Sequence, residues 1–307
     1  MSKRDSEQTP ENPPTDLEKR VEFLEQTVLQ AGSGNGAGRR SGRLSLVLVV
    51  VVIALLTVNA AFIKAHLDRE ADQAVQTAFW EICHPGLTAS QRSERFVQLA
   101  ADGNTEWQSA ILDNLQLDQV DLSEMSIELA RFTKCSFKNA KFAKAVMNGS
   151  GLDLSDFSNA DFSSAKLRNT TFFKSTLVEA NFRNAELLST SLEQSKSQGA
   201  VFVAAKMGDA FLAMADLTDA DLTGADLSGA HLEATILKNA DLALANLYGA
   251  FMEDVDLTDS NWWRARGLES RQLEEFALRF SPTPNASESR QRDFQIWLSK
   301  RDETSEN

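Results

Sequence analysis

The sequence predicts a solenoid, a fold made by stacking one short repeat, with α-helical caps and an N-terminal transmembrane helix. Three observations predict it. A large apolar residue returns at every fifth position through about half of the chain, an uncharged apolar run lies near the N-terminus, and short helical patterns flank the repeats. A fixed period kept through many units is the sequence signature of repeat architectures. A chain of 307 residues has room for such a solenoid and for the segments around it.

The five-residue period keeps its phase from Leu112 to Trp262. Every position of this series is Leu, Phe, Met, Ile or Trp, with Ser197 as the exception. Two residues before each of these centres the side chain is small from Ala130 onward, almost always Ala, Ser or Thr. A helix repeats about every 3.6 residues and a strand about every 2, so neither produces this pattern. The repeat unit is therefore five residues long, and no insertion interrupts it.

Stretches such as Ala215-Asp-Leu-Thr-Asp and Ala220-Asp-Leu-Thr-Gly show the unit at its plainest. They resemble the A(D/N)LXX unit of the pentapeptide-repeat family. The resemblance covers residues 110–262 and implies an all-β solenoid, a right-handed quadrilateral β-helix in which four units form one square coil. The residue types suit this fold, because each side needs a large apolar residue to fill the axis and a small one where the backbone turns inward.

In such a coil, residues that are twenty apart in sequence stack directly above one another. We therefore expect the following phenylalanines to form an internal ladder: Phe142, Phe162, Phe182 and Phe202. Ser197 interrupts the apolar core, and replacing a large buried residue by a small one removes about 2–5 kcal/mol of local packing. Two interpretations are open for Ser197: a tolerated weak coil, which is favoured, or a functional kink.

The run Leu44–Ile63 contains no charged residue and predicts a transmembrane helix. A helix of this length spans about 30 Å, the hydrocarbon thickness of a bilayer. A cleaved signal peptide is the alternative, but the run is long and begins only after the tail 1–43. Three arginines precede the run, and Lys64 and Arg69 follow it, which favours a cytoplasmic N-terminus by a thin margin. We expect a single-pass protein of the cell (inner) membrane whose β-helix is extracytoplasmic.

Helical patterns flank the span and the repeats. Residues 17–28 have the pattern of a short amphipathic helix, and two interpretations are open: a solvated, partly helical tail, which is favoured, or a contact that supports weak homodimers. A glycine-rich linker follows it. Residues 64–109 predict a helical stalk and an N-terminal cap, the cap beginning near Thr88. Residues 263–307 predict a C-terminal helical cap, with Ser270 capping its first helix, and a disordered tail. Caps are expected because an uncovered edge of a solenoid invites aggregation.

Composition excludes several classes of function. The formal net charge is -13, and a surface without surplus bases does not bind nucleic acid directly. Two cysteines and three histidines exclude a disulfide scaffold and a multi-cysteine zinc module. No pattern indicates catalytic residues, a cofactor site or a metal site, so the chain is not expected to be an enzyme. Cys135 takes a small inward position, which predicts a buried, inert thiol.

The residue just before each repeat centre points outward. On one face three of these residues are aromatic rings, and a methionine lies beside them. They are Phe211, Met214, His231 and Phe251. An exposed apolar column of this kind indicates a contact surface. Two interpretations are open: the C-terminal helices fold back over the column, which is favoured, or the column binds another protein.

Charge is unevenly distributed along the repeats. Residues 110–206 carry eleven acids and eleven bases, whereas residues 207–262 carry eleven acids and one base. The acidic face includes Asp216, Asp221, Asp226, Asp241 and Asp256. The family resemblance implies an alternative function here, because some pentapeptide-repeat proteins protect DNA gyrase by mimicking the duplex. Asp is also the family's ordinary residue before the central Leu, so a solvated face is favoured. The leading hypothesis is a non-enzymatic, membrane-tethered scaffold that binds an unknown protein partner.

Overall fold

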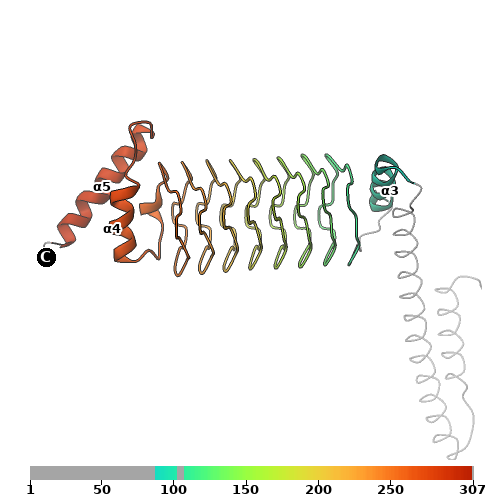
Figure 1. The fold of residues 1–307 in the computed structure, drawn as a ribbon, viewed down its shortest axis with the longest axis horizontal. Coiled ribbons are helices and arrows are strands. Elements are labelled where there is room, and N and C mark those ends of the chain that lie inside the picture. Colours follow the sequence, from blue (N-terminus) through green and yellow to red (C-terminus); the bar gives the residue numbers. More distant parts are fainter. Residues whose placement is uncertain (1–86, 102–106, 306–307) are drawn as a thin grey trace, which may run out of the picture. The chain divides into compact units, whose positions relative to one another are not determined.

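The computed structural model describes residues 87–101 and 107–305. In chain order the described part holds helix α3 (Ala89–Ala101), a column of stacked coils, the 3-10 helix η1 (Trp262–Arg264), α4 (Ser270–Arg279) and α5 (Glu288–Ser305). Figure 1 shows the coils stacked between α3 at one end and α4 with α5 at the other. The coils contain isolated bridges instead of longer strands, so the β structure is one residue wide on each side.

The coils are four-sided β-helix coils. Parallel bridges join residues twenty apart, from Ile111–Arg131 onward, with four bridges in each coil. Two hydrogen bonds make each rung: the N–H of Leu122 donates to the carbonyl of Lys141 (2.7 Å), and the N–H of Lys141 donates to the carbonyl of Val120 (2.8 Å). Each coil therefore satisfies the backbone of its neighbours, as a buried backbone requires.

A tight turn separates neighbouring sides of a coil. The N–H of Ala140 donates to the carbonyl of Phe137 (3.1 Å), and the residue between them, Asn139, has φ 56. The equivalent position lies in the left-handed region in every turn of the repeats, and it is often Asn, Asp or Gly. These residue types tolerate that conformation best. The five-residue unit thus consists of one bridged side and one turn.

The core confirms the predicted division of inward and outward positions. The repeat centres and the small residues two positions before them are buried. Ring centroids of the predicted ladder are 4.7 Å apart for Phe142–Phe162 and 4.9 Å apart for both Phe162–Phe182 and Phe182–Phe202, with nearly parallel planes. Stacked rings at this spacing add to the energy of burial. The phenylalanines of the chain therefore fill the axis of the coils.

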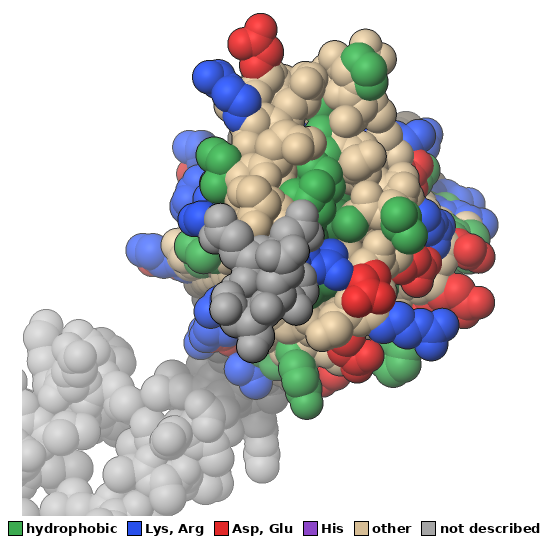
Figure 2. Space-filling view, turned by 90° about the vertical axis from the view of Figure 1, so that its left-hand side faces the viewer, with side chains coloured by type: hydrophobic (Ala, Val, Ile, Leu, Met, Phe, Trp, Pro, Cys, Tyr) green, Lys and Arg blue, Asp and Glu red, His purple; other side chains and the backbone are tan. Residues whose placement is uncertain are grey.

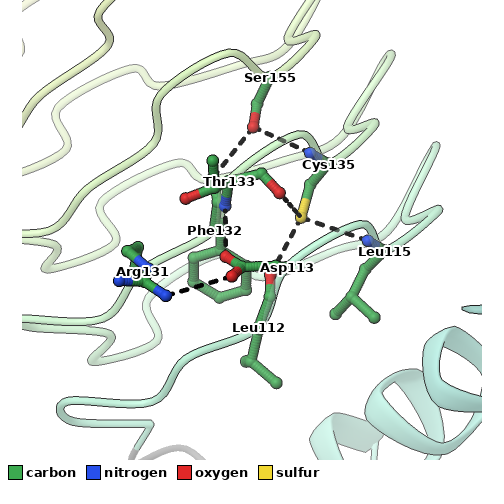
Figure 3. Close-up of polar contacts among 8 residues, drawn as sticks. All are labelled: Leu112, Asp113, Leu115, Arg131, Phe132, Thr133, Cys135 and Ser155. Carbon is green, nitrogen blue, oxygen red and sulfur yellow. Dashed lines mark hydrogen bonds and ion pairs between the residues drawn. The ribbon is translucent and has the colours of Figure 1, made fainter.

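Small hydroxyl residues at the inward corners have a second role. The Oγ of Ser155 donates to the carbonyl of Phe132 (2.9 Å) and accepts the N–H of Cys135 (3.0 Å). Cys135 repeats this arrangement one coil earlier with its thiol and the carbonyl of Leu112 (3.1 Å), as Figure 3 shows. In other turns the corner N–H donates directly to the carbonyl three residues earlier, as Ala140 does to Phe137. Here the hydroxyl or thiol of the next coil lies between the two groups and bonds both. Ser, Thr and Cys at this position are therefore hydrogen-bonded residues inside an apolar core.

Ser197 does not interrupt the coils. Its N–H donates to the carbonyl of Asp216 (2.8 Å), as the other centres do. Its side chain is buried and lies 2.9 Å from the Oγ of Ser195. The backbone ladder continues on both sides, so this position is a coil with a polar pair in its core and carries no kink.

Helix α3 covers the first coil. Phe96 is buried against Trp107, with ring centroids 4.7 Å apart, and against Phe132 at 6.1 Å. The Oγ of Ser93 accepts the N–H of Gln116 (2.9 Å), a group that would otherwise face an absent preceding coil. The helix begins at Ala89, close to the predicted start near Thr88. It therefore supplies both the apolar cover and a hydrogen-bond acceptor for the open edge.

Helices α4 and α5 cover the other end, and Figure 2 shows the molecule from that end. Trp262 is buried among rings of both helices, and its Nε1–H donates to the carbonyl of Phe280 (3.0 Å). Trp262 lies in η1 and forms no bridge, and the chain makes one more bridge, Asn246–Arg266, before it leaves the coil for the cap.

Two details of the C-terminal prediction are wrong. The residue that caps α4 is Glu269, which exchanges hydrogen bonds with Gln272 in a capping box, and Ser270 is the first residue of the helix. The predicted disordered tail is helical as far as Ser305, because it continues α5, which is anchored where its Phe294 packs on Trp262. The last two residues lie outside the described part of the chain.

The N-terminal predictions fall outside the described residues. These are the tail 1–43, the amphipathic stretch 17–28, the transmembrane run Leu44–Ile63 and the stalk up to residue 86. Within the residues that the structure does describe, no helix is both long and apolar enough to cross a bilayer.

Candidate protein-interaction surface

Three aromatic side chains form a stacked column on the outside of the β-helix. Phe211, His231 and Phe251 are joined by consecutive bridges, which places them in register on one face. The ring centroids are 4.9 Å apart for Phe211–His231 and 4.7 Å apart for His231–Phe251, with interplanar angles of 13° and 14°. We call these three residues the aromatic column. The rung spacing itself imposes the stacking, because neighbouring strands lie about 4.7–4.9 Å apart.

The aromatic column is open to solvent. Phe211 is 40% exposed and Phe251 is 53% exposed, while His231 is partly buried between them. The favoured prediction that the C-terminal helices cover this column is wrong. Phe276 and Phe280 pack on each other, and Phe276 packs on Trp262 at the end of the β-helix. The large apolar cross-section of the open end attracts the helices more than the narrower side does.

Further exposed apolar groups extend the column. Met214 is exposed in the turn that follows Phe211, and Tyr248, the only tyrosine of the chain, is 74% exposed in the turn before Phe251. Gly208 and Gly229 stand in the corresponding turns of the two coils before Tyr248, and the side chains of Ser228 and Asp209 lie close to them. Met214 and Tyr248 thus add exposed apolar surface near the aromatic column.

His231 has a polar neighbour on the same face. Its Nδ1 lies 3.3 Å from the Oε1 of Glu233, and both side chains are partly exposed. The equivalent turn of the next coil carries Glu253 and Asp254, which are exposed. The apolar column is thus flanked by acids on its C-terminal half. A partner that covers it would match an apolar stripe beside negative charge.

The predicted acidic face has a local structural role. Each of the five carboxylates accepts the backbone N–H of the residue two positions later, at 2.9–3.2 Å. These residues are Asp216, Asp221, Asp226, Asp241 and Asp256. Such Asx-type bonds stabilise turns. The acids also lie on three different sides of the coil, since residues twenty apart share a side and these do not all do so.

The pKa of Asp256 illustrates the same point. Burial raises the pKa of this carboxyl, but hydrogen bonds from Thr258 and the nearby ammonium of Lys238, at 3.2 Å, outweigh it and hold the pKa below its ordinary 3.8. Asp256 is therefore an ionised turn residue with its charge partly neutralised.

Nothing in the described ranges gathers catalytic or metal-binding groups. No group of three or more His, Cys, Asp or Glu that could hold a metal ion occurs there. Burial raises the pKa of the Cys135 thiol to about 11, so the thiol is protonated at neutral pH and unreactive, as its inward position predicts. Cys83 and His84 lie outside the described residues.

The five-residue repeat matches a known family model. The model of pentapeptide repeats matches in eight copies over residues 110–149, 130–177, 155–194, 198–233 and 225–261. The repeat region of this chain belongs to the pentapeptide-repeat family. Pentapeptide-repeat proteins form right-handed quadrilateral β-helices and are generally non-enzymatic structural or interaction proteins.

Solved pentapeptide-repeat structures are similar to the chain at low identity. QnrB1, a plasmid-mediated fluoroquinolone resistance protein, is 18% identical over 57% of this chain and 91% of its own, with a TM-score of 0.44. HetL, involved in heterocyst differentiation regulation in the cyanobacterium Nostoc, is 23% identical over 54% and 95%, with a TM-score of 0.24. A pentapeptide-repeat protein from the thylakoid lumen of Arabidopsis thaliana is 25% identical over 47% and 86%, with a TM-score of 0.29.

No curated protein matches this chain.

The sequence predicted the register of the aromatic column correctly. It did not predict the exposed Tyr248, nor that the repeat centre Met252, in the last coil, is only partly buried. Tyr248 stands in a turn, where the five-residue pattern allows almost any residue. The twenty-residue register would have found it, because it places Tyr248 in the coil of Phe251. The uncovered edge at Met252 carries no signal in the pattern, since Met is an ordinary centre residue.

Proposed function

We propose that this protein is a non-enzymatic, membrane-tethered scaffold whose pentapeptide-repeat domain binds a protein partner along Phe211, His231 and Phe251. The observation that carries the proposal is the exposed aromatic column, in which three rings stack in register on one face of the rod. Exposed apolar patches on soluble domains mark contact sites, and aromatic residues supply much of the energy of such contacts. A rigid β-helix supports this role because it holds the three rings in register without the entropy cost of ordering them on binding.

The tether in this proposal is the uncharged run Leu44–Ile63. A single span would hold the rod at the bilayer surface, with its N-terminus cytoplasmic and the β-helix outside the cytoplasm. The short amphipathic stretch 17–28 would add weak self-association, favoured by confinement to two dimensions. Protease digestion of intact spheroplasts tests the sidedness: the β-helix should be accessible without lysis. Protection until lysis would contradict the extracytoplasmic placement.

Alanine substitution tests the docking surface. Phe211→Ala with Phe251→Ala should abolish recovery of a crosslinked partner from detergent extracts of native membranes, at unchanged melting temperature. Leu244→Ala is the matched control, because Leu244 is exposed in a turn of the same acidic half. It should leave recovery intact. Recovery of the same partner by the double variant would refute the proposal.

The acidic coils support a second candidate function, mimicry of a DNA duplex toward a DNA-binding enzyme such as gyrase. Eleven acids against one base in residues 207–262 favour it. Two observations count against this function. Five of these carboxylates bond backbone N–H groups in turns, and they lie on three sides of the coil instead of forming one continuous acidic stripe. Inhibition or protection of gyrase supercoiling by the purified full chain, lost when Asp221 and Asp241 become Asn, would establish this function. No effect on supercoiling at any ratio would exclude it.

A further inference from the structure

The rungs on the face of the aromatic column stop abruptly at Phe251. One and two coils earlier, the N–H of Leu212 donates to the carbonyl of His231 (2.8 Å), and the N–H of Leu232 donates to the carbonyl of Phe251 (2.8 Å). The final bridge of the β-helix joins Asn246 to Arg266, on the side before Phe251. The chain then turns at Gly267 and enters α4, so no rung follows the 250–254 side of the last coil.

Three backbone groups of this side, those that point away from the preceding coil, have no partners within the described part of the chain. By the pattern of earlier coils, the N–H groups of Met252 and Asp254 and the carbonyl of Ala250 should each bond a following rung, and none of them does. Met252 is also the single repeat centre in the described chain that is not buried. On the next side Leu257 is buried, whereas Ala250 and Met252 are only partly buried and Glu253 and Asp254 are exposed.

We propose that a partner segment adds a further rung to this edge, in parallel with residues 250–254. The proposal rests on the proposed docking function and specifies its mode. Strand addition to an exposed sheet edge gives affinity through main-chain hydrogen bonds and specificity through side chains. The added rung would accept the N–H groups of Met252 and Asp254 and donate to the carbonyl of Ala250. It would continue the column, because its outward side chain would stack on the free face of Phe251 at the rung spacing.

The side chains around the edge define the chemistry of this segment. The repeat geometry gives it a small residue, then an outward aromatic residue over Phe251, then a large apolar residue over Met252. Glu253 and Asp254 are exposed beside it, and the single base of residues 207–262, Lys238, is paired with Asp256. The next two residues of the segment are therefore basic.

A second copy of this chain fits the edge less well than such a segment. Two copies paired through residues 250–254 would bring Glu253 and Asp254 of one copy against those of the other, and like charges directly opposite destabilise paired strands. The occupant is thus an extended segment of another protein with the order small, aromatic, apolar, basic, basic.

Fluorescence anisotropy on the detergent-solubilised full chain tests the proposal. The probe is a fluorescein-labelled peptide, Ser-Ala-Phe-Leu-Lys-Lys-Ser, held at a fixed concentration while the protein is titrated. We expect saturable binding with a Kd below about 1 mM. Methylation of the peptide's Phe nitrogen removes the donor to the Ala250 carbonyl, and it should weaken binding about tenfold. Replacing both peptide lysines by glutamates should abolish binding.

Two protein variants complete the test. Asp254→Lys should weaken peptide binding about fivefold by charge reversal. Asp209→Lys is the matched control, because Asp209 is also exposed and also stands at a left-handed turn position, with φ 54 against 55, but on another side of the coil. Binding to Asp209→Lys should equal that of the unmodified chain. Both variants should unfold at the same denaturant concentration.

Several results would overturn the proposal. The N-methylated peptide binding as tightly as its parent would exclude main-chain pairing, and equal effects of the two lysine variants would exclude this edge. Disulfide crosslinks between copies carrying Asp254→Cys, without peptide binding, would assign the edge to a second copy. The docking function is separable: a native partner that is lost with Phe211→Ala but retained with Asp254→Lys would keep the aromatic column as a binding site and reject strand addition.

Discussion

Truncation of the internal phenylalanine ladder should show how much ring stacking adds to the core. Phe162→Ala and Phe202→Ala remove the same side chain from the same buried column. Phe162 contacts four rings: stacked Phe142 and Phe182, and Phe157 and Phe172 edge-on at 5.5 and 5.6 Å. Phe202 contacts one ring, Phe182, at 4.9 Å. The pair therefore isolates the contribution of three ring contacts.

The expected magnitude follows from these contacts. A buried Phe→Ala change costs about 3–5 kcal/mol, which we expect for Phe202→Ala. Three additional ring pairs at about 0.5 kcal/mol each make Phe162→Ala more destabilising by about 1.5 kcal/mol. Loss of secondary structure in guanidinium chloride, followed by circular dichroism on the detergent-solubilised full chain, measures the difference if both variants keep the same slope. Equal midpoints for the two variants would refute the argument that stacking adds to burial here.

Three further predictions concern the caps and the thiol. A hydrogen bond from Arg264 lowers the pKa of Asp293 below 3.8, so this pair stabilises the fold above about pH 4 and the stability is lost as pH falls through the lowered value; Asp293→Asn should lower the urea midpoint more at pH 7 than at pH 3, and an equal loss at both would contradict the pair's role. The pKa of about 11 predicts that Cys135, in a Cys83→Ser background, resists iodoacetamide at pH 8 until the protein is unfolded, as mass spectrometry of the labelled chain would show. Ser93→Ala should destabilise the first coil by about 1–3 kcal/mol because a backbone N–H loses its acceptor, measurable as faster hydrogen exchange in that coil, whereas unchanged exchange would show that α3 does not cap it through this bond.

The repeats were predictable because their signal is local and repeated. Every coil requires one large side chain at the axis and one small residue at the corner per five residues. The regular alanines are therefore visible in the sequence, and so is Ser197, the one exception among the centres. The stacked rings of the ladder and of the aromatic column follow from the twenty-residue register alone. The exposure of that column does not follow, because it depends on where distant helices pack.

The amino-acid sequence by itself determined the β-helix, the inward phenylalanines, the inert Cys135 and the register of Phe211, His231 and Phe251. The tertiary structure decided which surfaces stay open. Helices α4 and α5 pack on the end of the rod, where Trp262 offers the larger apolar area, and they leave the aromatic column exposed and Met252 only partly buried. A periodic pattern records which way each side chain points, but the competition between two apolar surfaces for one pair of helices depends on areas and shapes that exist only after the coils have stacked.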